Sequence, residues 1–157
     1  MSMHSMYPES RMWFYGLQQP LTDEQTQVLR SLMDDFVGQW KAHGAQLAAA
    51  YRIIGNQCLI IAVDERQQQA TGCSIDKSVH LLMEFGQQYG VDFFNRMLIF
   101  TADKNGIQAY TPTALKAAIA SGEITPESLV MHTLAPTLGA SGTGMIPLSE
   151  SWARRYL

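Results

Sequence analysis

Two long segments of this chain repeat apolar residues at helical spacing, with strand-forming segments before, between and after them. Apolar residues three and four apart fall on one face of a helix, and that face must be buried against another layer. Thr22 is placed to cap the first helix, and Gln25 stands at the spacing of a capping box. Gly44 is expected to end this helix, and Ser74 and Gly90 are expected to begin and end the second one. The two apolar stripes are Val28, Leu29, Leu32, Met33, Phe36, Val37 and Trp40, and Ile75, Val79, Leu82, Gly86 and Tyr89.

Four strand-forming segments complete the pattern: residues 12–15, 49–54, 58–63 and 96–101. The dipeptide Gly55-Asn56 is typical of a tight turn, so the middle two segments are expected to form a hairpin. The order strand, helix, strand, strand, helix, strand predicts a ferredoxin-like βαββαβ core over residues 12–101. This is an α+β fold whose mainly antiparallel sheet carries both long helices on one face. A different α+β sheet stays open, because strand order cannot be read from one sequence.

The C-terminal third adds shorter elements. We expect a strand over residues 107–110, a helix over 112–119 that opens with proline, and an extended segment over 129–131. We expect this C-terminal extension of strands and a helix to add to the sheet or to cover part of the face opposite the two long helices. No domain-sized linker interrupts the chain, so residues 1–157 are predicted to form a single domain, with residues 1–10 disordered.

Charge and cysteine content exclude several classes of partner. The net charge is −3 and the basic residues are scattered, which disfavours nucleic acid and anionic membrane surfaces. The longest apolar run, residues 58–63, is too short to span a bilayer, and residues 1–11 lack the apolar stretch of a signal peptide. We therefore expect a cytoplasmic protein. Cys58 and Cys73 match no metal-binding spacing, so we predict reduced thiols, no metal and no cofactor.

The start of the second helix carries the candidate chemistry. If that helix begins at Ser74, Cys73 lies beside free N–H groups that favour negative charge, and Gly72, Cys73 and Ser74 form a candidate anion- or ligand-binding site. Asp76 and His80 fall four residues apart on one flank. Cys73, Asp76 and His80 are therefore candidate catalytic residues, as nucleophile, orienting group and base. A structural role, in which serine caps and cysteine fills an apolar niche, explains the same residues and is favoured.

Two further features suggest ligands. Asp64 follows a buried strand and is a candidate ligand-binding residue, although a solvated strand end also explains it. Residues 139–144 resemble the glycines of a phosphate-binding loop, but Met145 and Ile146 stand where that motif needs lysine and serine or threonine. We therefore predict that the protein neither binds nor hydrolyses ATP.

Two aromatic residues raise the question of assembly. Trp13 and Tyr15 share one face of the first strand, and we predict that this is the helix-free face of the sheet. Large apolar patches are rare on monomers, so either the C-terminal third or a second subunit is expected to cover them. A homodimer is the favoured assembly.

Several segments together resemble a family of small bacterial proteins of uncharacterised function that sometimes carry the label "ABC transporter ATPase". The similar segments run over nearly the whole chain: residues 13–15, 61–64, 72–79, 91–94 and 147–152. The resemblance implies no activity, cofactor or active-site residue. The chain also lacks the Leu-Ser-Gly-Gly-Gln signature that the label requires.

Two functional hypotheses follow from the sequence. The first is a small non-catalytic binding or interaction module whose exposed sheet face or pocket binds a partner protein, a second copy of the chain, or a small ligand. The alternative is a small enzyme or redox protein that uses Cys73 at a helix N-terminus. The sequence favours the first, because no set of catalytic residues converges in it.

Overall fold

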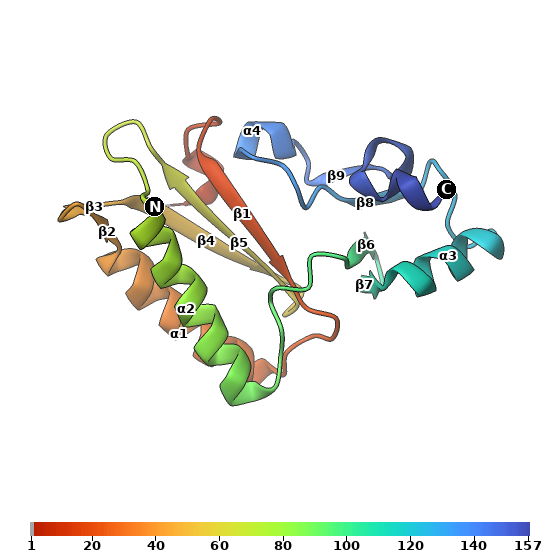
Figure 1. Cartoon of the computed structure of the whole chain (residues 1–157), viewed down its shortest axis with the longest axis horizontal. Helices are drawn as coiled ribbons and strands as arrows, with labels where there is room; N and C mark the ends of the chain where they lie inside the picture. The colour runs from red at the N-terminus through yellow and green to blue at the C-terminus, as the bar shows by residue number, and fades with distance from the viewer. Residues whose placement is uncertain (1) are drawn as a thin grey trace.

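The computed structural model describes residues 2–157 and shows an α+β fold with antiparallel sheets (Figure 1). Within that range, no helix combines the length and apolar character needed to cross a membrane. The strands are β1 (Arg11–Gly16), β2 (Lys41–Ala42), β3 (Ala45–Gln46), β4 (Ala48–Ile54), β5 (Cys58–Asp64), β6 (Ile99–Asp103), β7 (Gly106–Tyr110), β8 (Leu129–Met131) and β9 (Met145–Pro147). The helices are α1 (Asp23–Gln39), α2 (Gly72–Tyr89), α3 (Pro112–Ala120) and α4 (Leu138–Ser141), with short 3-10 helices η1 (Met3–Ser5), η2 (Leu148–Glu150) and η3 (Trp152–Tyr156).

The main sheet has three strands in the order β1-β5-β4. Both outer strands run antiparallel to β5, so β1 and β4 are parallel to each other and α1 connects them. The predicted hairpin is confirmed: Ile54 pairs with Cys58, and Gly55 and Asn56 both have positive φ in the turn. This arrangement is a split βαβ unit, with β5 inserted between two parallel strands.

The predicted fourth strand does not join this sheet. β6 begins at Ile99 and pairs with β7 instead, through a turn at which Asp103 faces Gly106. A two-strand hairpin closed by a short turn has a small loop-closure entropy, whereas pairing with β1 would join distant segments. The α+β class and the antiparallel sheet are therefore confirmed, but the ferredoxin-like core predicted for residues 12–101 is wrong in its last strand.

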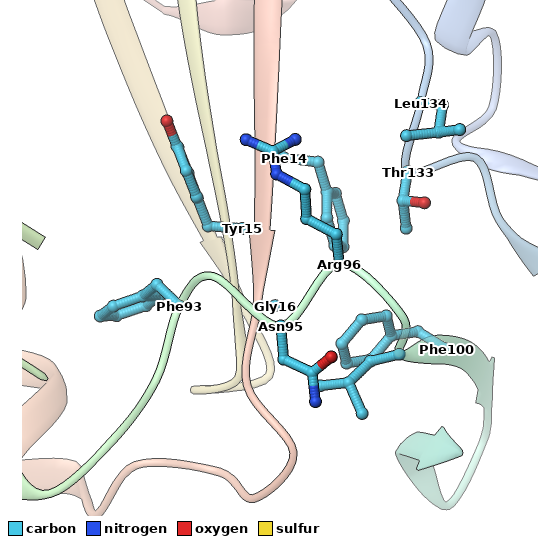
Figure 2. A pocket seen from close by; sticks show the side chains of 10 residues that line it. Phe14, Tyr15, Gly16, Phe93, Asn95, Arg96, Phe100, Thr133 and Leu134 are labelled. Atoms are coloured by element: carbon cyan, nitrogen blue, oxygen red, sulfur yellow. The ribbon is translucent and has the colours of Figure 1, made fainter. Parts of the chain in front are cut away.

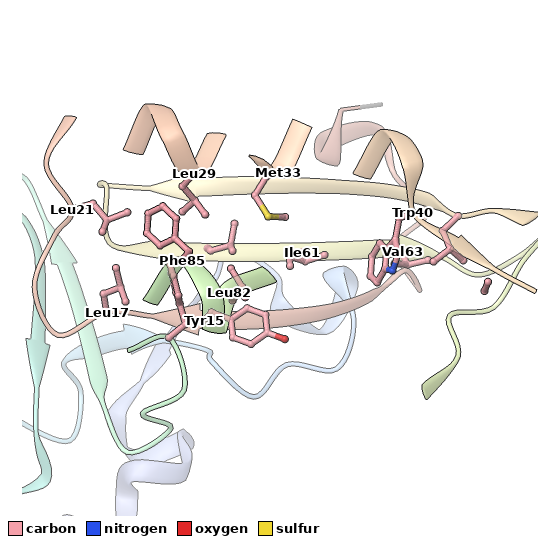
Figure 3. Packing of buried hydrophobic residues seen from close by; sticks show 14 residues of the cluster. Tyr15, Leu17, Leu21, Leu29, Met33, Trp40, Ile61, Val63, Leu82 and Phe85 are labelled. Carbon is pink, nitrogen blue, oxygen red and sulfur yellow. The ribbon is translucent and has the colours of Figure 1, made fainter. Parts of the chain in front are cut away.

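Both long helices lie on one face of the sheet, as predicted (Figure 3). The residues buried between helices and sheet include Leu29 and Met33 of α1, Leu82 and Phe85 of α2, Leu59, Ile61 and Val63 of β5, and Tyr15 of β1. The predicted stripe of α1 is too wide, because Val28 and Leu32 remain 38% and 39% exposed.

The opposite face of the sheet is covered by other parts of the same chain. Leu98, Phe100 and Met131 pack with Cys58 of β5 at one end. Met6, Met12 and Ala135 pack with Ala50 and Ala62 at the other end. The expectation that the C-terminal third covers part of this face is therefore confirmed.

Two sequence predictions about the same surfaces need correction. Trp13 and Tyr15 belong to the helix-side cluster and not to the helix-free face, because they share the orientation of Leu59 and Ile61 across the β1–β5 ladder. They therefore give no reason for a second subunit, and the homodimer stays a prediction. Residues 2–10 are not disordered, since Met6 is 7% exposed and Ser10 is fully buried. Residue 1 lies outside the described residues.

A buried hydrogen bond ties the end of α1 to the start of α2. The Trp40 Nε1–H donates to the Ser74 carbonyl oxygen at 2.7 Å. The predicted stop of α1 was Gly44, but the helix ends five residues earlier, at Gln39, because the backbone of Trp40 is already extended. Gly44 lies in the turn between β2 and β3. This bond fixes the separation of the two helices at their shared end.

We expect Trp40→Phe to lower the free energy of unfolding by about 1–3 kcal/mol, because the buried Ser74 carbonyl loses its indole donor. Urea denaturation followed by circular dichroism measures the change. Trp152→Phe is the matched control, since the Trp152 indole forms no hydrogen bond within the described chain. Equal losses in the two variants would contradict this role for the Trp40 bond.

Candidate functional site

The predicted motif at the start of α2 forms a helix cap, but with a different capping residue. Thr71 is the N-cap, and Ser74 is the third residue of the helix. The Thr71 hydroxyl accepts from the Ser74 N–H at 3.2 Å, and the Ser74 hydroxyl accepts from the Thr71 N–H at 2.7 Å. The prediction that Ser74 caps the helix is therefore wrong, because the helix begins two residues earlier, at Gly72.

The three candidate catalytic residues do not form a hydrogen-bonded cluster. Cys73 is exposed in the first turn of α2, and Asp76 and His80 are exposed further along it. Among residues 2–157, no hydrogen bond joins any two of these side chains, and no three His, Cys, Asp or Glu side chains are grouped to hold a metal. A catalytic role for Cys73 stays a prediction.

Asp64, the other candidate from the sequence, is engaged by a neighbour. Both of its carboxylate oxygens accept hydrogen bonds from the Arg66 side chain, the shortest at 2.7 Å. The hydrogen bonds from Arg66 lower the pKa of the Asp64 carboxyl. The pair closes the turn that follows β5, which accounts for Asp64 without a ligand.

The structure instead contains a cleft along the outer edge of β1, where the fourth strand of the predicted sheet would lie. This β1-edge cleft has a volume of about 490 Å³. One wall is β1 from Met12 to Tyr15, and the opposite wall is the segment 133–137. Figure 1 shows the C-terminal part of the chain beside β1 on this side.

Pairing of the opposite wall with β1 begins at one end of the cleft and then stops. The Leu138 N–H donates to the Ser10 carbonyl and the Met12 N–H donates to the Pro136 carbonyl, both at 3.0 Å. The next bond of an antiparallel ladder would run from the N–H of residue 136 to the Met12 carbonyl. Proline has no N–H, so the ladder ends at Pro136.

Beyond Pro136, the edge of β1 is open. In a β-strand, the backbone N–H and C=O groups of every second residue point to the same edge. The Met12 N–H points away from β5, so the N–H and C=O of Phe14 also point away from β5. Neither group has a backbone partner within the described part of the chain. The cleft therefore exposes an unpaired stretch of sheet edge, which is a template for another strand.

Arg96 lies at the far end of this open edge. Its guanidinium group extends over β1 between the side chains of Tyr15 and Phe14, and Thr133 and Leu134 lie beyond Phe14 (Figure 2). It has no ion-pair partner in residues 2–157. Burial raises the pKa of the Tyr15 phenol above its usual value, while the positive charge of Arg96 opposes that shift.

The remaining charges of the cleft lie near its other end. The Arg11 guanidinium is 4.0 Å from the Glu65 carboxylate and 4.8 Å from the Trp13 ring centre. Glu9 also lines the cleft there. Arg11 therefore has the carboxylates of Glu65 and Glu9 near it, whereas Arg96 has neither. A ligand in the middle of the cleft would meet the positive charge of Arg96 without competition from these two carboxylates.

Sequence reasoning missed this site. Arg96 is the only lysine or arginine between Lys77 and Lys104, which is a weak signal for a placed charge. Pro136 marks a break in strand pairing, but only the structure shows that the strand concerned is β1. An open edge is a property of how strands are arranged, and a single sequence does not contain it.

Comparisons with known proteins give no relative for this chain. No family model, no curated protein and no solved structure matches it. The functional proposal therefore depends on the geometry of the cleft.

The open edge of β1 predicts which backbone amides of this strand exchange rapidly with solvent. The N–H groups of Trp13 and Tyr15 point to β5, whereas that of Phe14 points into the cleft. We expect the Phe14 amide to exchange about two orders of magnitude faster than the amides of Trp13 and Tyr15. Exchange followed by NMR measures this, and equal protection of the three amides would show that the edge is closed.

The two thiols are expected to differ sharply in reactivity. Burial raises the pKa of the Cys58 thiol to about 12, and its sulfur lies among apolar residues, whereas Cys73 is exposed. Iodoacetamide at pH 8 should modify one thiol per folded chain, and peptide mass mapping should place it at Cys73. Modification of Cys58 should require denaturant, so its rapid alkylation in the folded protein would contradict this placement.

Proposed function

We propose that this protein is a non-catalytic binding module that takes up an extended peptide segment of a partner protein in the β1-edge cleft, by adding it as a strand to β1. The observation that carries the proposal is the open edge of β1 between Pro136 and Arg96. Strand addition to an exposed sheet edge is a general mode of peptide recognition, in which backbone hydrogen bonds give affinity and pockets for alternate side chains give specificity.

The chemistry of the edge favours a polypeptide over other ligands. The N–H and C=O of Phe14 both face the cleft, and an extended backbone offers both complementary groups at the right spacing. The open stretch from Met12 to Tyr15 is about 13 Å long at the usual rise per residue, enough for three or four peptide residues. The cleft volume of about 490 Å³ falls in the range of ligand sites.

The charge of Arg96 favours a carboxylate in the peptide. Its guanidinium group extends beside the open edge and has no acidic partner within the described residues (Figure 2). A planar guanidinium group binds a carboxylate through two parallel hydrogen bonds. The carboxylate is that of an aspartate or glutamate side chain, or of a peptide C-terminus. Leu134, which is 57% exposed on the opposite wall, offers an apolar contact beside it.

The alternative function, thiol chemistry at Cys73, rests on a single favourable feature. Cys73 is exposed in the first turn of an 18-residue helix. A catalytic thiol also needs a base or another activating group within reach, and no hydrogen bond of the described residues supplies one to Cys73. The binding module is the better-supported function.

Selection from a displayed library of random heptapeptides tests the proposal. We expect the enriched peptides to carry β-prone residues at alternate positions and one carboxylate. Arg96→Gln should weaken their binding about tenfold or more, because it removes a charge-assisted hydrogen bond. Leu134→Glu should weaken it similarly by repelling the carboxylate. Fluorescence anisotropy of labelled peptides measures both losses, and amidated peptides distinguish a terminal carboxylate from a side chain.

Matched controls and a backbone scan make the test specific. Arg30→Gln, at an exposed arginine of α1, and Leu129→Glu, at a leucine that is 55% exposed on β8, should leave binding unchanged. Methylating each peptide nitrogen in turn should abolish binding at every second position, as strand pairing requires. The proposal fails if no peptide is enriched, if Arg96→Gln binds as tightly as the native protein, or if the scan lacks this period of two.

A further inference from the structure

A second cavity lies on the face of the sheet opposite α1 and α2, and it shares only Met12 with the residues that line the β1-edge cleft. It has a volume of about 680 Å³. We propose that it binds a small amphipathic anion: an apolar chain that carries a phosphate or carboxylate group. Its charged and polar groups do not line the peptide cleft, so either proposal can fail without the other.

The floor of the cavity is apolar. It is formed by Ile60 of β5 and Ile54 of β4, with Met3 and Leu138 at the sides. The two groups of residues that cover this sheet face lie toward its opposite ends, one around Ala62 and one around Cys58. The cavity occupies the part of the sheet between them, so an apolar ligand would complete the cover of the face.

The polar groups of the cavity favour a negative charge. Arg52 extends from the same face of β4, and its side chain forms no ion pair or hydrogen bond with any residue from 2 to 157. His4 also lines the cavity, and neither aspartate nor glutamate does. An anion would therefore meet a cationic side chain without an acidic competitor in the cavity lining.

The glycine-rich segment singled out in the sequence forms the rim beside these groups. Ser141, the last residue of the short helix α4, lines the cavity together with Gly142, Thr143 and Gly144. The N–H groups of Gly142 and Gly144 are used in local turns, at 3.1 and 2.8 Å. The Thr143 N–H donates to no backbone group of the described chain, which leaves it free for an anion. The segment lacks the lysine of a nucleotide-binding loop, and Arg52 supplies the positive charge from the sheet.

Titration with decyl phosphate, kept below the concentration at which it forms micelles, tests this inference. We expect saturable binding by calorimetry, and NMR shifts centred on the amides of Arg52, Ile60 and Thr143. Arg52→Gln should weaken binding about tenfold or more. Thr143→Asp, at an exposed residue, should weaken it by adding a negative charge at the rim. A parallel titration with decanoate distinguishes the head groups: binding of both indicates a general anion site, and binding of decyl phosphate alone indicates a phosphate site.

The controls separate charge recognition from adsorption of an apolar chain. Arg30→Gln lies on α1, which covers the opposite face of the sheet, and should leave binding unchanged. Decyltrimethylammonium has the same chain with a positive head group and should not bind. The inference is overturned if decyl phosphate fails to bind, if Arg52→Gln binds it as tightly as the native protein, if the cationic amphiphile binds equally, or if the shifts fall outside this cavity.

Discussion

β5 is the strand on which the rest of the structure depends, because it is buried on both faces and bonded on both edges. Leu59, Ile61 and Val63 face the helices, and Cys58 and Ala62 face the other way, all at most 1% exposed. Side chains of alternate residues point to opposite faces of a strand, so two separate layers are needed to cover them. α1 and α2 supply one layer. The C-terminal third and the first ten residues supply the other.

The apolar residues on the sheet face opposite α1 and α2 must be buried. This explains why the C-terminal third lies beside β1 without extending the sheet. Phe100 fits against Gly16, where an added Cβ would lie 2.2 Å from the phenyl ring. Met131 meets Cys58, and Ala135 packs beyond them over Ala62. Within residues 2–157, the C-terminal third bonds to this edge only at Ser10 and Met12, and Pro136 ends the pairing there.

What the sequence predicted well is local, and what it missed depends on distant contacts. The hairpin at Gly55-Asn56, the end of α2 at Gly90 and the first turn of α3 at Pro112 each follow from the backbone preferences of a few residues. The continuous apolar run of β5 was a signal for a strand covered on both sides, since alternation would indicate one exposed face. The side of the sheet on which Trp13 lies, and the partner of β6, depend on pairing register and on competition between strands, which local preferences do not fix.

The start of α2 and the edge of β1 offer a ligand different backbone groups. At the start of α2, Thr71 and Ser74 satisfy each other's N–H groups and Trp40 donates to the Ser74 carbonyl. The groups left without a partner among the described residues are the N–H groups of Gly72 and Cys73, which are donors only. At the edge of β1 the N–H and C=O of Phe14 are held in place by the ladder to β5 and have no backbone partner in the described part of the chain. A strand bound there gains hydrogen bonds without breaking any in the protein, and it meets a backbone whose conformational entropy was lost on folding.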